Sequence, residues 1–258
     1  MGSGGLISII TAVYEPKAQY FPETARSVLS QRLPAGWSME WLVMIDGADE
    51  ESARLIAKKA DILGSPKIQL HAVSERSGQA LVRNLALSLA RGQLIRMIDH
   101  DDIMLPGALW RDISTMDAHP DIAFCTSSTI NNDPSGEYDG GWLDPPEGPL
   151  ELGQIYNWWR ERDCVIPIHP ATACVRTAHL RAVGGWMALQ PMTEDVGMLV
   201  ALNELWPGWF NSKRSLEYRI WPDQTSTPLT EDDPVRQASC EAVSQRAKAL
   251  RALRKQMS

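Results

Sequence analysis

The stretch Leu94-Ile95-Arg96-Met97-Ile98-Asp99-His100-Asp101-Asp102 decides the fold. The apolar residues on both sides of Arg96 predict a short buried strand, because such side chains suit a covered sheet. Three carboxylates and a histidine follow at its carboxyl end. In open α/β sheets ligands bind outside the carboxyl ends of strands. The acidic turn is therefore a candidate site for a hard divalent cation that carries a phosphate-bearing ligand.

A simpler explanation of the acidic turn stays open at this point. Aspartate is common in solvated turns and before the first residue of helices, where its carboxylate caps backbone amides. Asp102 in particular could cap the helix that follows. The sequence on both sides of the acidic turn is needed to decide between a cation site and a solvated or capping turn.

Strands and helices alternate along the first half of the chain. Apolar runs predict strands at residues 6–13, 40–45, 67–73 and 94–98, with helices from residue 22, over 50–62 and up to residue 90. Alternation with short connections predicts an α/β fold with a Rossmann-like, mostly parallel central sheet flanked by helices. The carboxyl edge of that sheet would gather four polar clusters, which are Tyr14-Glu15, Asp46, Ser77-Gly78 and the acidic turn.

Composition limits the classes of function. The 258-residue chain has a net charge of −7, and broad nucleic-acid binding is not expected because it needs a cationic surface. The four cysteines form no CxxC pair, so we expect buried thiols in a reducing compartment rather than a zinc site. No apolar run approaches the roughly 18 residues of a membrane span, and residues 6–13 lack the cationic flank of a signal peptide. These features predict a cytoplasmic protein without a transmembrane segment.

Five blocks of the first half resemble family 2 glycosyltransferases, which have the GT-A fold. In chain order they are Ala12-Val13-Tyr14-Glu15, Ser27-Val28-Leu29-Ser30-Gln31, Ile45-Asp46-Gly47-Ala48-Asp49, the segment from Glu75 to Ala86 with Ala90-Arg91-Gly92, and Ile98-Asp99-His100-Asp101-Asp102 with Pro106. Each block alone is a weak signal, but their order and spacing are specific. Glu15 departs from the usual Asn, and Ile45 departs from the first Asp of the family's second-strand pair. Both departures leave the identity of the bound base open.

The resemblance implies a nucleotide-sugar-binding half at residues 6–116, after a disordered N-terminus at residues 1–5. The residues that it implies for nucleotide binding are Val13, Tyr14, Glu15, Asp46, Gly78, Arg83, Asp99 and His100. Asp46 would accept the N–H of uracil or thymine, and amides near Gly78 would face an anion. The implied cofactor is Mn²⁺ or Mg²⁺, with Asp101 and Asp99 as metal ligands. Taken from the residues alone, Asp46 could be a turn residue, Arg83 a surface charge and His100 idle.

The resemblance also implies an acceptor-binding and catalytic half at residues 117–230, followed by a C-terminal helix within 231–258. Here we expect strands at 121–130, 168–176 and 215–221, a loop at 131–149 and a helix at 150–162. Glu194 and Asp195 match the family's Glu-Asp motif, with Asp195 as general base and Glu194 as its neighbour. Acids in the first turn of a capped helix are the alternative.

Candidate acceptor-side residues are His169, Trp158 and Trp186, because aromatic groups line ligand pockets. Packing in the core is the alternative for the tryptophans. Many relatives carry a metal-side or phosphate-side histidine where this chain has Trp221 and Pro222. His169 is a candidate substitute from another loop.

The function implied by the resemblance is a metal-dependent, inverting, non-processive glycosyltransferase of the hexosyltransferase type. It would move a sugar from a UDP- or TDP-sugar to a hydroxyl or amine of an unidentified acceptor, and a homo-oligomer would be compatible with the sequence. A sugar-phosphate nucleotidyltransferase is the first alternative, although Tyr14-Glu15-Pro16-Lys17 lacks the glycine-rich loop that holds a triphosphate. A catalytically dead nucleotide-sugar-binding protein is the second, because the histidine is missing.

Overall fold

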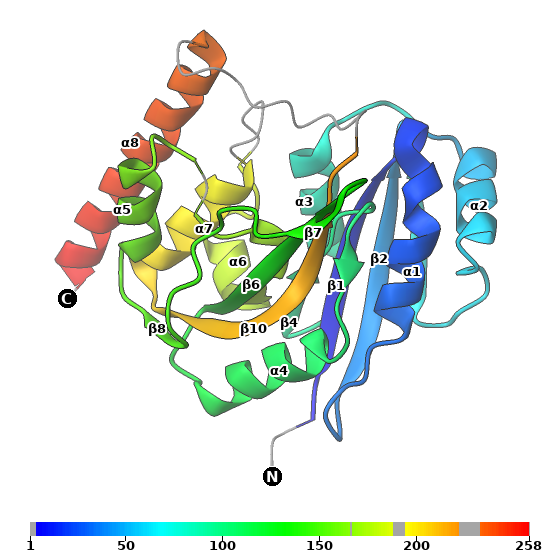
Figure 1. The fold of residues 1–258 in the computed structure, drawn as a ribbon, viewed down its shortest axis with the longest axis horizontal. Helices are drawn as coiled ribbons and strands as arrows, with labels where there is room; N and C mark the ends of the chain where they lie inside the picture. Colours follow the sequence, from blue (N-terminus) through cyan, green and yellow to red (C-terminus); the bar gives the residue numbers. More distant parts are fainter. Residues whose placement is uncertain (1–3, 166, 188–193, 222–232, 258) are drawn as a thin grey trace.

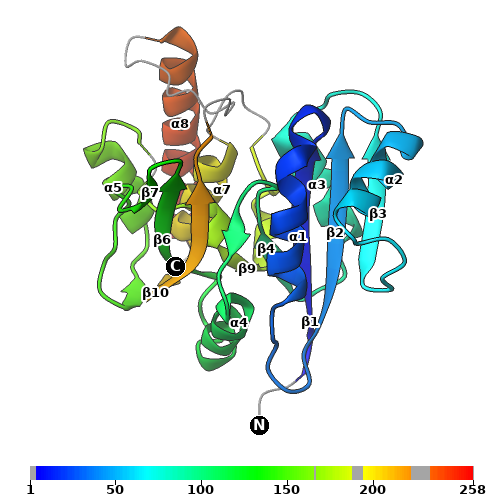
Figure 2. The same ribbon diagram turned by 45° about the vertical axis from the view of Figure 1, so that its right-hand side comes forward.

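A single mixed sheet runs through the molecule (Figures 1 and 2). The computed structural model describes residues 4–165, 167–187, 194–221 and 233–257. The strands are β1 (Leu6–Tyr14), β2 (Ser38–Asp46), β3 (Ile68–Val73), β4 (Leu94–Met97), β5 (Ile103–Met104), β6 (Phe124–Asp133), β7 (Gly136–Tyr138), β8 (Gly148–Leu150), β9 (Cys174–Arg176) and β10 (Gly208–Arg219). Their order is β3-β2-β1-β4-β9-β6-β10-β5, with β7 paired to β6 and β8 paired to β10.

Helices cover both faces of this sheet. The α-helices are α1 (Phe21–Leu29), α2 (Glu50–Lys59), α3 (Gln79–Leu89), α4 (Ala108–Ala118), α5 (Gln154–Glu161), α6 (Thr177–Ala182), α7 (Glu194–Leu205) and α8 (Pro234–Met257), and η1 (Glu15–Tyr20) and η2 (Pro170–Thr172) are short 3₁₀ turns. Figure 2 shows α1 in front of the β1–β2 region and α3 behind it. The predicted α/β fold is confirmed.

The first half of the sheet is parallel and buried, as its apolar runs predict. β1 pairs in parallel with β2 on one side and β4 on the other, and β2 pairs with β3. All residues from Ile7 to Val13 are buried. A strand covered on both faces has no polar face to alternate with, which explains its continuous apolar sequence.

Direction changes in the middle of the sheet, where the sequence predictions were least accurate. Only Cys174–Arg176 of the predicted strand 168–176 pairs, and it lies antiparallel between β4 and β6. Pro170 has no N–H to donate to a strand and opens η2 instead. The predicted loop 131–149 contains the short strands β7 and β8.

The last strand, β10, begins at Gly208, earlier than predicted, and ends at Arg219. Gly208 pairs with Phe124, and a Cβ at Gly208 would lie 2.4 Å from the Phe124 ring. A glycine is therefore needed where β10 meets β6. The helix predicted over 150–162 is shorter and begins at Gln154.

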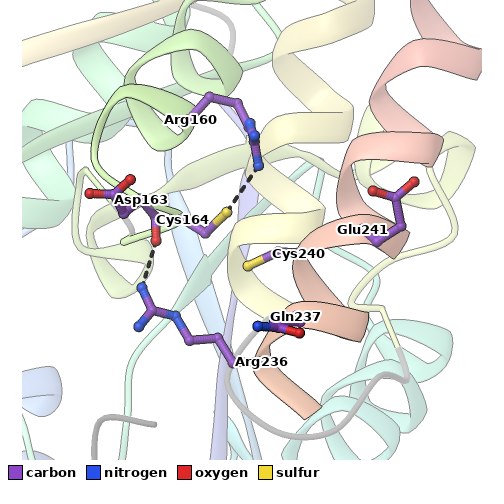
Figure 3. Close-up of a pocket in the computed structure, with 7 residues that line it drawn as sticks. All are labelled: Arg160, Asp163, Cys164, Arg236, Gln237, Cys240 and Glu241. Atoms are coloured by element: carbon purple, nitrogen blue, oxygen red, sulfur yellow. Dashed lines mark hydrogen bonds between the residues drawn. The ribbon is translucent and has the colours of Figure 1, made fainter. Parts of the chain in front are cut away.

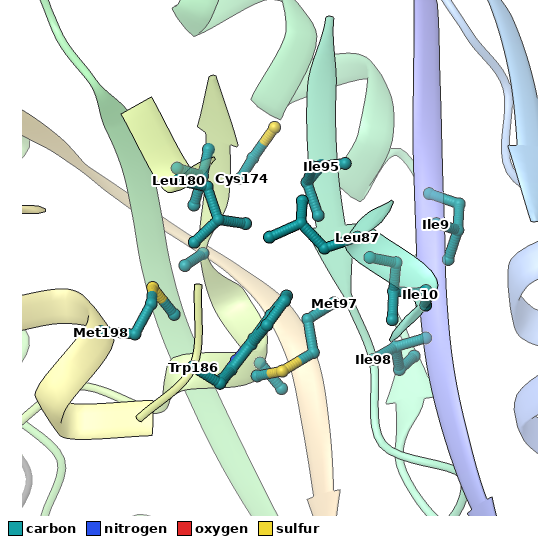
Figure 4. Close-up of a cluster of buried hydrophobic side chains, with 14 of the residues drawn as sticks. Ile9, Ile10, Leu87, Ile95, Met97, Ile98, Cys174, Leu180, Trp186 and Met198 are labelled. Carbon is teal, nitrogen blue, oxygen red and sulfur yellow. The ribbon is translucent and has the colours of Figure 1, made fainter. Parts of the chain in front are cut away.

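The core of the second half packs around α7. Figure 4 shows Trp186 beside Met97 and Met198, with Leu87 and Leu180 above it. α7 is buried from Val196 to Glu204 and lies against α5, α6 and α8. The Glu204 carboxylate is fully buried and accepts from Arg251 of α8 at 2.5 Å. The C-terminal helix therefore supports the helix that begins with Glu194 and Asp195.

Both predicted halves contribute strands to the same sheet, since β9 covers the edge of β4 and β10 pairs with β5. At the start of the chain, the Gly5 amide donates to the Gly36 carbonyl at 3.1 Å. Gly5 is thus bonded to the rest of the chain, and residues 1–3 of the predicted disordered N-terminus lie outside the described residues. No helix in the described ranges is long and apolar enough to cross a bilayer.

Candidate active site

The acidic turn after β4 is anchored on both sides. The Thr24 hydroxyl of α1 donates to the His100 carbonyl at 2.8 Å. The Asp102 carboxylate is fully buried and accepts from the backbone N–H of Arg219 at 3.1 Å. The suggestion that Asp102 caps the next helix is wrong, because α4 begins at Ala108 with Gly107 before it. Asp102 instead attaches the turn to β10.

Arg219 is a site residue that the sequence reasoning missed. Its side chain is 4% exposed and donates to the Asp101 carbonyl, the Glu23 carboxylate and, at 3.2 Å, the Tyr20 carbonyl. The guanidinium also lies over the Trp221 ring, 5.2 Å from its centroid. The available signal was a charged residue at the end of a strand, directly before the segment in which relatives have a histidine.

Trp221 and Tyr20 form an aromatic pair beside Arg219. Their rings are stacked with centroids 4.2 Å apart. The position where relatives were expected to carry a histidine therefore holds a packed indole, and Pro222 lies outside the described residues.

Arg83 joins the candidate general base, Asp195, to Asp99, a candidate metal ligand. It lies on α3 and is 1% exposed, so the surface-charge interpretation is wrong. Its Nη1 donates to Asp195 Oδ1 at 2.9 Å, and its Nη2 donates to Asp99 Oδ1 at 2.5 Å and to Gln79 Oε1 at 3.1 Å. Asp195 lies in the first turn of α7, and Asp99 in the acidic turn. One guanidinium thus brings together residues from three separate segments.

The two carboxylates bound by Arg83 titrate differently. Burial raises the pKa of Asp195 to about 7; the Arg83 guanidinium acts in the opposite direction, and the negative charges of Glu194 and Asp99 add to the effect of burial. Burial also opposes ionisation of Asp99, but the Arg83 guanidinium holds the pKa of Asp99 below its usual value. A pair of carboxylates with separated pKa values is typical of sites that divide charge stabilisation from proton transfer.

The remaining carboxylates of the acidic turn resist ionisation. Burial, with the added negative charge of Asp99, raises the pKa of Asp101, and burial raises the pKa of Asp102 well above its usual value. Asp102 Oδ2 and both ring nitrogens of His100 are buried without a hydrogen-bond partner within the described chain. The turn therefore concentrates acceptor atoms that a cation would satisfy.

Asp46 closes the loop before α3. Its Oδ1 accepts from the Ser77 amide at 2.8 Å and its Oδ2 from the Gly78 amide at 3.1 Å. Gly78 has a φ of 83°, in the left-handed region that favours glycine. Asp46 is thus the last residue of β2 and fixes the loop before α3, which differs from the local turn role of the alternative interpretation, and it lies at the edge where a base was expected.

The other predicted nucleotide contacts lie around β1. Val13 is fully buried, Tyr14 ends the strand, and Glu15 opens η1. The Arg76 guanidinium lies 4.6 Å from the centroid of the Tyr14 ring. Val13 itself is enclosed by the sheet and presents no exposed surface to a ligand.

His169 belongs to a buried aromatic cluster next to the acidic turn. Its ring centroid lies 4.9 Å from that of Trp142 and 4.6 Å from that of Tyr218. Burial lowers the pKa of His169 to about 4, although the nearby charge of Asp99 acts in the other direction. Its Nδ1 accepts from the Ala171 amide at 3.2 Å, which places the proton of the neutral ring on Nε2.

The two predicted acceptor-side tryptophans lie elsewhere. Trp186 is 2% exposed and belongs to the core (Figure 4). Trp158 is partly buried on α5, which lies on the side of the molecule that carries α8 (Figure 1). Core packing, the alternative interpretation, describes Trp186. Within the part of the chain that the structure describes, no three His, Cys, Asp or Glu side chains are arranged to hold a metal.

A sheet of this topology with an acidic turn at its carboxyl edge is the architecture of GT-A glycosyltransferases. The family model "Glycosyl transferase family 2" matches residues 8–173, and the chain belongs to this family.

Curated relatives match less than half of the chain. This chain is 32% identical to the putative teichuronic acid biosynthesis glycosyltransferase TuaG of Bacillus subtilis over 97 residues; the aligned region covers 38% of this chain and 36% of TuaG. The chain is 28% identical to the uncharacterized glycosyltransferase MJ1057 of Methanocaldococcus jannaschii over 118 residues; this aligned region covers 45% of the chain and 39% of MJ1057. The matches span 13% to 39% of the length of the curated relatives.

Solved structures share the fold over nearly the whole chain. S. aureus TarS 1-349 in complex with UDP-GlcNAc has a TM-score of 0.71 at 17% identity, over 96% of this chain and 71% of TarS. The mannosyltransferase PcManGT from Pyrobaculum calidifontis, in complex with GDP-Man and Mn²⁺, has a TM-score of 0.61 at 14% identity, over 100% of this chain and 78% of that chain.

Proposed function

We propose that this chain transfers a sugar from a UDP- or TDP-sugar to an acceptor hydroxyl or amine, with Asp195 as general base and inversion at the anomeric carbon. The observation that carries the proposal is the Arg83 bridge. It holds the candidate base, Asp195, next to Asp99 at the carboxyl edge of the sheet, where α/β folds bind their ligands.

A nucleotide sugar as donor is supported by the solved relatives. TarS was crystallised with UDP-GlcNAc and PcManGT with GDP-Man. The preference for uracil or thymine rests on Asp46. Both of its oxygens accept a backbone amide, but each carboxylate oxygen has a second lone pair that can accept the imide N–H of the base.

The acidic turn suits a divalent cation that arrives with the nucleotide. Mg²⁺ is commonly held by one or two carboxylates together with substrate phosphates, so a three-residue protein site is not required beforehand. Asp101 and Asp99 would be its ligands. The buried Asp102 Oδ2, which has no donor within the described residues, supports a cation near this turn. A bound cation would neutralise the negative charge of the departing diphosphate.

Asp195 has the properties of a base that works near neutral pH. With a pKa of about 7, about half of the Asp195 side chains are ionised at neutral pH, and the ionised carboxylate is basic enough to take a proton from the acceptor. The acceptor O–H or N–H gives its proton to Asp195 as the acceptor atom bonds to the anomeric carbon. The bond from that carbon to the phosphate oxygen breaks on the opposite face, and the nucleoside diphosphate leaves.

The test compares donor binding with donor turnover in Asp195→Asn. We expect the thermal shift caused by the donor and Mn²⁺ to be retained, and release of nucleoside diphosphate to fall by at least about 100-fold, which is the usual range for a lost general base. Asp117→Asn is the matched control, because Asp117 lies on α4, accepts from Trp37 at 3.2 Å and belongs to none of the site contacts. Turnover in Asp195→Asn equal to that of the control would refute the base assignment.

The donor base and the metal can be identified in one screen. Thermal unfolding is measured with UDP, TDP, GDP and ADP, each with and without Mn²⁺ or Mg²⁺. A metal-dependent shift with UDP or TDP supports the proposed donor, whereas a shift with GDP alone overturns the base preference. Binding of nucleotide sugars without turnover on any acceptor would favour the non-catalytic alternative.

A further inference from the structure

Two cysteines face each other in a cavity outside the candidate active site. The cavity has a volume of about 320 Å³ and lies between the turn after α5 and the first turns of α8. Figure 3 shows the sulfur atoms of Cys164 and Cys240 pointing toward one another across it. Both cysteines are free and half-buried. The proposed transfer chemistry uses neither.

The turn that carries Cys164 has an uncommon backbone. Asp163 and Cys164 have φ values of 50° and 64°, in the left-handed region that few side chains adopt. The Cys164 amide donates to the Trp159 carbonyl at 2.9 Å, and Arg236 of α8 donates to the Asp163 carbonyl at 2.6 Å. These bonds hold the turn in the conformation that directs the Cys164 thiol at α8.

The surroundings of the pair favour a reactive Cys164. Arg160 Nη1 lies 3.3 Å from Cys164 Sγ, so a positive charge is in direct contact with this sulfur. Burial, followed by its hydrogen bond with Cys164, raises the pKa of Cys240 to about 12, so Cys240 keeps its proton next to the Cys164 sulfur. The pair is therefore asymmetric, with Cys164 as the attacking sulfur and Cys240 as the resolving one.

The other two cysteines provide an internal comparison. Cys125 and Cys174 lie directly opposite each other on β6 and β9, and both are fully buried. An oxidant in solution has no access to these two buried thiols. Proximity of two thiols is shared by both pairs; exposure to solvent and the direct contact of Arg160 with a sulfur atom belong to Cys164 and Cys240.

We propose that Cys164 and Cys240 are a redox modification site, at which a peroxide forms an intramolecular disulfide joining α8 to the turn after α5. The Cys164 thiolate attacks one peroxide oxygen, the O–O bond breaks, and a sulfenic acid and hydroxide result. Cys240 then attacks the Cys164 sulfur, the S–O bond breaks, and the second hydroxide leaves; the two thiol protons convert both hydroxides to water. Hydrogen peroxide thus takes two electrons from the two thiols, and a small dithiol reverses the reaction.

The test counts free thiols in the full chain after treatment with hydrogen peroxide. Thiols are blocked with a maleimide under denaturing conditions, and intact masses are compared. We expect the wild type to fall from four blocked thiols to two and to lose two hydrogens in mass. Cys164→Ser and Cys240→Ser should each keep three, because each lacks one partner. Cys125→Ala, the matched control from the buried pair, should fall from three to one.

Several outcomes would overturn the proposal. They are a wild type that keeps four thiols, a Cys164→Ser or Cys240→Ser chain that still loses two, a disulfide that links two chains on a non-reducing gel, and oxygen additions without a disulfide. Cys125→Ala keeping three would assign the disulfide to the strand pair instead. None of these measurements involves sugar transfer, so the outcome is independent of the proposed function.

Discussion

The pH dependence of turnover follows directly from the burial of Asp195, whose pKa Arg83 keeps from rising further. A base with a pKa of about 7 is one-tenth ionised one pH unit below that value and nine-tenths ionised one unit above it. We therefore expect nucleoside-diphosphate release to rise about tenfold between pH 6 and pH 8, as the ionised fraction does. An ordinary carboxylate would be fully ionised throughout this range.

Replacing Arg83 by glutamine should move this profile to higher pH. Two charges in contact at a partly solvated site interact by up to about 4 kcal/mol, which corresponds to ~3 pKa units. The Asp195 side chain is 19% exposed, and glutamine can still donate a hydrogen bond, so we expect a shift of about one to two units. A pKa of ~8.5 would leave about 3% of Asp195 ionised at pH 7 instead of half, a loss of roughly 15-fold.

The assay is release of nucleoside diphosphate from the donor between pH 5.5 and pH 9.5. Activity of Arg83→Gln should approach that of the wild type at the alkaline end, which damage to the fold would not produce. Arg91→Gln is the control, because Arg91 pairs with Glu40 at 2.8 Å near the start of β2 and its side chain is 72% exposed. The reasoning fails if the wild-type profile is flat above pH 6, or if Arg83→Gln is impaired by the same factor at every pH.

Three further predictions concern stability and the metal. The folded-state pKa of Asp195 exceeds the ordinary 3.8, so the folded chain binds an extra proton between about pH 4 and pH 7, and its unfolding free energy falls as pH rises through that window. In urea unfolding, the decrease in unfolding free energy from pH 5 to pH 8 should be about 2 kcal/mol smaller in Asp195→Asn than in the wild type. An equal decrease in both proteins would contradict the prediction. Arg96→Met should lower the unfolding free energy by about 3–5 kcal/mol, because it leaves the buried Asp112 without its 2.9 Å partner. The double variant with Arg96→Met and Asp112→Leu should recover most of this loss. An equal loss in the single and the double variant would argue against the broken ion pair as the cause. Chelation by EDTA should abolish donor turnover until Mn²⁺ is restored. The Asp101→Asn variant should lose the Mn²⁺-dependent part of the thermal shift caused by the nucleotide. An unchanged thermal shift in this variant would exclude Asp101 as a metal ligand.

The elements of the first half were accessible to sequence reasoning because local patterns fix them. β1 and β2 are covered on both faces, so their apolar residues run without interruption and mark the strands directly. The early part of β10 was missed because its register shifts between Asn211 and Leu216. Polar residues fill this irregularity and interrupt the strand pattern.

The site was predictable in its parts and not in its connections. The acidic turn, Asp46 and the Glu194-Asp195 pair each carry a local signal. The bond from Arg83 to Asp195 spans 112 positions, and that from Arg219 to Glu23 spans 196. No spacing rule on one sequence relates residues so far apart, because tertiary packing alone decides which side chains meet.

The position of β9 between β4 and β6 also determines when this protein can finish folding. During synthesis, β1 to β4 leave the ribosome well before residues 174–176, so the first half of the nascent chain has an unpaired β4 edge. An open edge strand is a template for aggregation, and contacts between distant segments slow folding. The sheet is closed, and the acidic turn is fixed by Arg219, only after β9 and β10 have emerged. Folding of the sheet therefore has to wait for the last third of the chain. We expect stalled or truncated chains that end before β9 to require chaperones to remain soluble.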